Sequence, residues 1–87
     1  MSRVHMPEAP QTLSSVPAGG HAIVHSLQGG RGFRSRVANL GFTVGAPITV
    51  LQNYGHGPMI VSVRGVRVAL GRAEADKVLV RPLDGTQ

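Results

Sequence analysis

The segment from Arg34 to Gly45 constrains the fold more than any other part of the chain, because it combines a short helix, an abrupt stop and the start of a strand. The apolar face of the helix consists of residues at i, i+4 and i+7, namely Phe33, Val37 and Leu40. These positions predict a helix over about residues 31–40. Gly41 follows directly, where a residue with positive φ commonly ends a helix, and Gly45 opens a β-prone run over 46–54. Such a helix-to-strand connection indicates a small binding domain.

The rest of the chain reads as short strands separated by glycine turns. The expected strands cover 21–27, 46–54, 59–63, 66–70 and 77–81, with Pro82 ending the last. Alternation in the first strand places Ala22, Val24 and Ser26 on one face and Ile23, His25 and Leu27 on the other. Arg64 and Gly65 predict a tight hairpin turn in which Gly65 supplies the positive φ. The segment 71–76 predicts a short helical turn before the last strand.

Five strands with turns at close intervals predict a mainly β fold. A small barrel is the arrangement that removes most exposed strand edges. The first eleven residues carry two prolines and no periodicity, so we expect 1–11 to be a flexible tail, and 83–87 likewise. The barrel domain should therefore span residues 12–82, with Gly41, Gly45 and Gly65 as its structural turn residues.

Composition excludes several classes of protein. A chain of 87 residues forms one domain with a modest core, and without cysteine it has neither disulfides nor thiolate metal sites. No apolar run approaches the roughly 20 residues that cross a bilayer, and the N-terminus lacks the apolar region of a signal peptide. We therefore expect a cytoplasmic protein without membrane insertion. The acidic residues are scattered and no serine has a local triad context, so we expect no catalytic residues and no enzyme.

The charge balance favours an acidic partner. Nine basic residues against four acidic ones give a net charge of +5. Such a charge suits an acidic protein surface or a nucleic acid. The chain has only three aromatic residues, Phe33, Phe42 and Tyr54, whereas single-strand binders usually expose several for base stacking. A nucleic-acid-binding small β-barrel is therefore the alternative, and nucleic acid is the less favoured partner.

Four histidines raise the question of a metal site. His21 and His25 would chelate at i, i+4 on a helix, but in a strand they lie about 13 Å apart at about 3.3 Å per residue. His56 lies in a glycine turn, and no cysteine or nearby acidic residue completes a ligand set. We expect no required cofactor and no dedicated metal site. A divalent ion could bind only weakly and adventitiously, at His21, His25 or His56.

The order and spacing of the apolar and glycine residues resemble a known family. The positions that carry the resemblance are Leu13, Val16, Gly19, Gly20, Ile23, Val24, Arg36, Val37, Leu40–Phe42, Gly45, Ile48–Val50, Pro58–Val61, Val66–Leu70, Glu74, Ala75 and Val78–Val80. Over about residues 12–80 they resemble the FeoA family of ferrous iron uptake in bacteria and archaea. The resemblance implies an SH3-like barrel of about five strands, with one short helix inserted after the first strand and a short helical turn before the last.

The resemblance also implies a function. Members of the family are cytosolic accessory proteins, so the chain would act on a FeoB-type membrane transporter through protein–protein interaction. The expected contact is the transporter's cytoplasmic GTP-binding region, and weak homo-oligomerisation is compatible with this role. The same barrel occurs as a module of metal-dependent repressors, but eleven tail residues cannot supply their winged-helix domain, so we expect the free-standing form.

We place the docking surface on the helix side of the barrel. Helical inserts on small barrels often form partner surfaces, and exposed arginines would steer an acidic partner toward them. The candidate partner-binding residues are Arg31, Arg34, Leu40 and Phe42. The turn from Gly55 to Pro58 is the next candidate.

Overall fold

The computed structural model describes residues 9–83, so most of the two expected tails, residues 1–8 and 84–87, lies outside the described part. The elements in chain order are β1 (Gln11–Thr12), the 3-10 helix η1 (Leu13–Ser15), β2 (His21–Leu27), α1 (Arg31–Asn39), β3 (Pro47–Gln52), β4 (Met59–Val63), β5 (Val66–Leu70), α2 (Arg72–Ala75) and β6 (Val78–Leu83). Within residues 9–83 no helix is both long and apolar enough to cross a bilayer.

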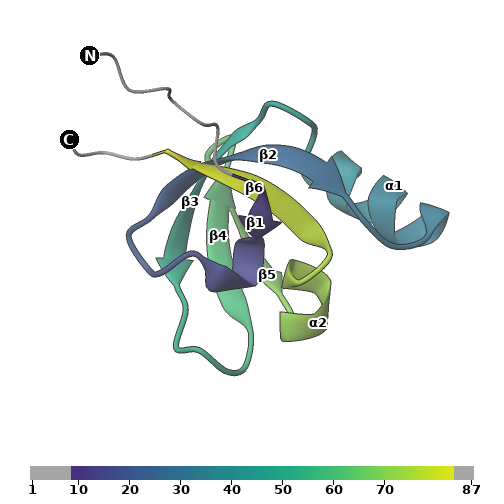
Figure 1. Cartoon of the computed structure of the whole chain (residues 1–87). Coiled ribbons are helices and arrows are strands. Elements are labelled where there is room, and N and C mark those ends of the chain that lie inside the picture. Colours follow the sequence, from purple (N-terminus) through teal and green to yellow (C-terminus); the bar gives the residue numbers. More distant parts are fainter. Residues whose placement is uncertain (1–8, 84–87) are drawn as a thin grey trace, which may run out of the picture.

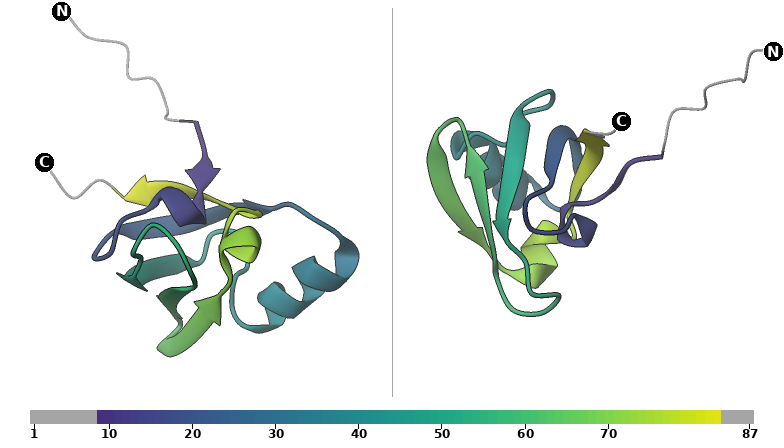
Figure 2. Two further views of the ribbon diagram at one scale, coloured as in Figure 1. Left: turned by 90° about the horizontal axis from the view of Figure 1, so that it is seen from below. Right: turned by 90° about the vertical axis from the view of Figure 1, so that its left-hand side faces the viewer.

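The six strands form one antiparallel sheet in the order β1-β6-β2-β3-β4-β5. The sheet curls around the core, and α1 leaves it between β2 and β3 to project from one end of the molecule (Figures 1 and 2). The mainly β prediction, with one short helix and a helical turn before the last strand, is confirmed. The strand count differs by one because β1 has only two residues, which pair with Val80 and Leu79 and are too few to show any alternation.

The core consists almost entirely of aliphatic side chains and one aromatic ring. Its largest fully buried side chains are Phe42, Leu13, Met59 and Leu70, and valines make up most of the remainder. Branching at Cβ suits valine to a pleated strand packed on one face. No polar or charged residue of the described chain is buried.

A bulge in β2 changes which residues face the core. The register with β6 shifts between Val24 and Ser26, so His25 is the extra residue. Because each extra residue reverses the alternation that follows it, Leu27 packs against the core on the same side as Ala22 and Val24. The expectation that Leu27 shares a face with Ile23 and His25 was therefore wrong.

Two strands end at residues other than those expected. β3 ends at Gln52 rather than 54, because the Asn53 side chain accepts a hydrogen bond from the Gly55 backbone N–H at 2.9 Å and forms a turn. β6 continues through Pro82, which lies opposite Ala22. Beyond Val80, β6 pairs with β2 alone within the described residues. A proline has no backbone N–H to donate, but on this side of β6 no second described strand is present to accept such a bond. The first strand of the structure thus begins at residue 11 and the last one ends at residue 83.

Glycine turns connect the elements as predicted. Arg64 and Gly65 both have positive φ, 53° and 79°, as a two-residue hairpin turn requires. Gly41 has φ 113° and ends α1: its N–H bonds the Ala38 carbonyl, and the Phe42 N–H bonds the Val37 carbonyl. This pair of bonds is a Schellman motif, and the side chains of Phe42 and Val37 are both buried in the core. Gly45 has φ 92°.

We expect replacement of Gly41 by alanine to destabilise the protein by about 1–3 kcal/mol. The residue has a φ that L side chains rarely adopt, and an added Cβ would lie 3.3 Å from Val63 Cγ2 and Arg64 Cδ. The matched control is Gly32→Ala within α1, where no atom lies within 4 Å of the added Cβ and alanine gains roughly 0.5–1 kcal/mol in helix propensity. Urea unfolding should shift the two midpoints in opposite directions. Equal shifts would contradict the role of Gly41.

Candidate partner-binding surface

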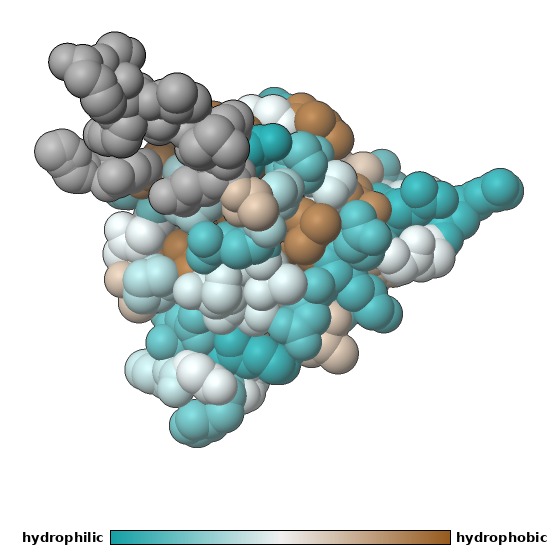
Figure 3. Space-filling model, in the orientation of Figure 1, coloured by the Kyte–Doolittle hydropathy of each residue, from teal (hydrophilic) through white to brown (hydrophobic). Residues whose placement is uncertain are grey.

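Helix α1 presents two arginines away from the barrel. Arg31 and Arg34 lie three residues apart and therefore on one face of the helix. Both are exposed, and neither side chain has a hydrogen-bond or ion-pair partner within residues 9–83. Figure 3 shows a hydrophilic projection at the end where α1 lies in Figure 1. Both charges are therefore accessible to a partner.

Contacts on the opposite face hold α1 in a defined orientation. Val37 is fully buried and Phe33 packs partly buried against the core. The Arg36 guanidinium pairs with the Glu74 carboxylate, which joins α1 to α2. The Arg36 and Lys77 cations lie 5.9 and 5.4 Å from the centre of the Phe33 ring, within the range of cation–π attraction. The projecting helix is thus attached to the barrel by apolar and charged contacts together.

Of the two expected apolar contact residues, the structure exposes one and buries the other. Leu40, the C-cap of α1, keeps 38% of its surface exposed and remains a candidate contact. Phe42 has no exposed surface, so its side chain cannot touch a partner in the folded protein. The assignment of Phe42 to the docking surface was therefore wrong, because the chain reverses at Gly41 and directs the next residue into the core.

The turn from Gly55 to Pro58 is exposed and fixed at its base. The Asn53 amide donates to the backbone carbonyls of Ser14 and Val16 at 3.0 and 2.8 Å, and its oxygen accepts from Arg72 Nη2 at 2.9 Å. Arg72 Nη1 also donates to the Ser14 carbonyl, at 3.2 Å. This polar cluster ties η1, α2 and the β3–β4 loop together.

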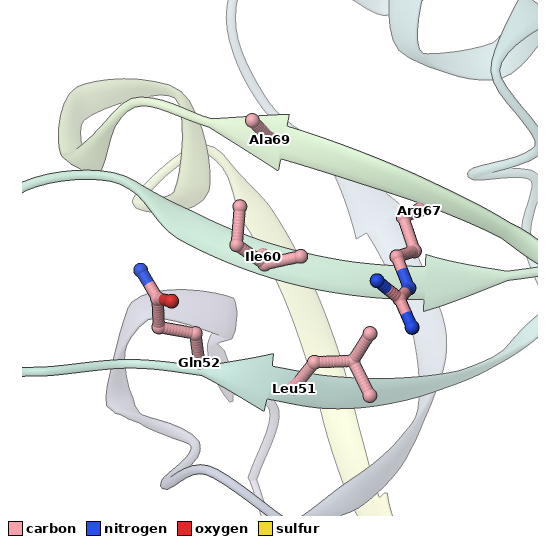
Figure 4. A pocket seen from close by; sticks show the side chains of 5 residues that line it. All are labelled: Leu51, Gln52, Ile60, Arg67 and Ala69. Carbon is pink, nitrogen blue, oxygen red and sulfur yellow. The ribbon is translucent and has the colours of Figure 1, made fainter.

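A second surface, which the sequence patterns did not indicate, lies on the outer face of the sheet. Leu51, Gln52, Ile60, Arg67 and Ala69 line an open groove of about 480 Å³ across β3, β4 and β5 (Figure 4). Leu51 is 43% exposed and Ile60 is half-buried. The one sequence signal for this groove was Leu51, a branched apolar residue at a strand position that should face water. It is weak, because single exposed apolar residues are common.

The histidines do not come together. His21 is exposed and its Nδ1 lies 2.9 Å from the Thr49 hydroxyl, His56 is exposed in the β3–β4 turn, and His25 is half-buried at the bulge of β2. Within residues 9–83, no three His, Asp or Glu side chains lie close enough to hold a metal ion together. Adventitious binding at single histidines stays a prediction.

Comparison with known proteins identifies relatives over most of the chain. Residues 11–82 match the model of the FeoA domain. A protein of Methanocaldococcus jannaschii, described as a candidate Fe(2+) transport protein A, is 32% identical over 68 residues, which make up 78% of this chain and 82% of the relative.

Solved structures support the same relationship. The crystal structure of an iron uptake regulatory protein, FeoA, is 40% identical with a TM-score of 0.81, over 86% of this chain and all of that one. Stenotrophomonas maltophilia FeoA, an SH3 domain protein crystallised with zinc, is 32% identical with a TM-score of 0.73, over 80% of this chain and 88% of that one. A manganese-dependent transcriptional repressor shares the fold at 19% identity, with a TM-score of 0.80 over 87% of this chain and 42% of that one. The predicted SH3-like fold is thereby confirmed.

Proposed function

The chain belongs to the FeoA family of ferrous iron transport accessory proteins, which are not enzymes, and from this premise we propose that it binds the cytosolic GTP-binding region of a FeoB-type transporter. The protein would act on the cytoplasmic side by protein–protein contact. The observation that carries the proposal is the pair of exposed arginines, unpaired within residues 9–83, on a helix that lies outside the sheet.

The arrangement of α1 suits a docking element. Arg31 and Arg34 extend into water while Phe33 and Val37 fix the helix on the barrel, so binding would order few additional groups. Leu40 adds exposed apolar surface at the end of the same helix. A positive patch beside an apolar contact favours an acidic protein surface that also contributes apolar side chains.

The distribution of aromatic residues argues against the nucleic-acid alternative. Phe42 is fully buried, Phe33 is half-buried with two cations close to its ring, and Tyr54 alone is largely exposed. Base stacking on single-stranded nucleic acid uses several exposed rings on one surface. The described surface has one such ring, in the loop after β3 and not on α1.

Reversal of the two free charges on α1 tests the proposed docking. In the Arg31→Glu/Arg34→Glu variant, we expect the association rate with the transporter's purified cytosolic domain to fall about tenfold or more at low ionic strength. The free energy of unfolding should change by no more than about 0.5 kcal/mol, because both side chains are exposed and unpaired. Surface plasmon resonance at several salt concentrations measures the rate, and urea unfolding measures the stability.

The matched control keeps the charge and changes the shape. Arg31→Lys/Arg34→Lys should retain most of the association rate, since steering depends on charge more than on the guanidinium group. If the double glutamate variant associates at the wild-type rate in low salt, the docking surface does not include α1, and the Gly55–Pro58 turn becomes the surface to test. Binding of DNA or RNA with a steep salt dependence would instead favour the nucleic-acid alternative.

A further inference from the structure

The outer edge of β5 has no strand beside it. β5 is the last strand of the sheet and pairs with β4 alone among the described residues. Figure 2 shows it, in green, at the rim of the molecule. An edge strand with free backbone groups is a template for one more strand.

The register of the β4–β5 hairpin identifies the free groups. Residues on either side of a two-residue turn exchange both ladder hydrogen bonds, so Val63 and Val66 are bonded to each other, and every second pair after them is bonded as well. Arg67 and Ala69 occupy the intervening positions. Their N–H and C=O groups therefore point away from β4 toward the open edge.

The same two residues line the groove on the outer face of the sheet. The Arg67 and Ala69 side chains stand beside Leu51, Gln52 and Ile60 (Figure 4). Backbone groups for strand addition and a mostly apolar depression thus adjoin each other. In known cases of strand addition the main chain supplies affinity and such depressions receive alternate side chains.

Charge identifies the occupant. Arg67 is exposed and its guanidinium has no partner within residues 9–83. The two acidic side chains of the described chain are both engaged, Glu74 with Arg36 and Asp76 with the Ser14 hydroxyl. A second copy would therefore bring another Arg67 and no free described carboxylate, whereas an acidic peptide would supply the missing partner.

We propose that the edge of β5 and the adjoining groove bind an extended segment of a partner protein that carries a carboxylate side chain opposite Arg67. On an added strand, residues two positions apart face the same side. The segment therefore needs an aspartate or glutamate with an apolar residue two positions away, which lies opposite Ala69 on the near side of the groove. This surface is separate from α1 and does not depend on the partner proposed above.

The test uses peptides of defined sequence and the full chain. The probe is acetyl-Thr-Val-Thr-Glu-Thr-Val-Thr-amide, and its matched control has lysine in place of the central glutamate. In NMR titrations of the isotope-labelled protein, we expect the glutamate peptide to bind at least about tenfold more tightly, with the largest shifts at the amides of Arg67 and Ala69. The Arg67→Glu variant should reverse the preference, while Arg31→Glu, the same charge change on α1, should leave it unchanged.

Backbone methylation separates strand addition from simple charge attraction. Methyl groups on alternate peptide nitrogens block hydrogen bonding along one edge of the peptide. We expect one of the two alternating sets to abolish binding and the other to leave it within about threefold, because only one edge of the added strand faces β5. If neither set of methyl groups abolishes binding, the peptide does not bind by strand addition. Equal affinity for the two peptides, no binding at about millimolar peptide, or self-association through β5 would each overturn the proposal.

Discussion

Phe42→Ala is expected to lower the free energy of unfolding by about 3–5 kcal/mol, the largest effect of any single substitution considered for this protein. Phe42 has no exposed surface and provides the largest fully buried side chain. Its truncation would leave a cavity at the point where α1 ends, next to Val37. Because domains of this size have a stability of roughly 5–15 kcal/mol, the variant should lose a large part of its stability. Urea unfolding followed by circular dichroism measures the change.

Tyr54→Ala is the matched control for Phe42. It removes an aromatic ring that is 71% exposed, so we expect a change within about 0.5 kcal/mol. The comparison also tests the position of Phe42 directly. A small effect of Phe42→Ala on stability, together with weakened partner binding, would contradict its burial and restore it to the docking surface.

Asn53→Ala should destabilise the protein by about 2–4 kcal/mol, because one side chain serves four hydrogen bonds. The Ser14 carbonyl would keep its bond from Arg72, whereas the Val16 carbonyl would lose the amide that approaches it at 2.8 Å. The β3–β4 loop would also lose the bond that closes its first turn. Thermal unfolding measures the loss of stability, and amide hydrogen exchange should show faster opening of the loop.

One further variant separates the donor and acceptor functions of the Asn53 amide, and a second variant, at Asn39, is the control. Asn53→Asp keeps the acceptor for Arg72 and Gly55 but loses both donated bonds, so its stability should fall between those of wild type and Asn53→Ala. Asn39→Ala removes an exposed amide at the end of α1 and should change stability by no more than about 0.5 kcal/mol. Equal effects of Asn53→Ala and Asn39→Ala would show that the polar cluster contributes nothing.

The sequence by itself determined the local features. Gly41 ends α1 because the residue after a helix needs a positive φ that glycine adopts without strain, and neighbouring residues alone decide this. The turn at Arg64 and Gly65 follows from the same kind of preference. Apolar alternation over 66–70 predicts Val66, Val68 and Leu70 on one buried face; Val68 and Leu70 are in the core, whereas Val66, next to the turn, is 54% exposed. Each of these features depends on a few consecutive residues, which is why a pattern could reveal it.

Tertiary structure alone decided the features that join distant segments. β1 forms because Gln11 and Thr12 pair with β6. Two residues are too few to show a periodicity of their own. The bulge at His25 arises in the pairing of β2 with β6, and it directs Leu27 to the core against the alternation. Phe42 is buried because the chain reversal directs it inward, although an apolar residue beside a helix could equally face a partner. The groove beside β5 brings together side chains from three strands. Such contacts depend on register and sheet curvature, which local preferences do not specify.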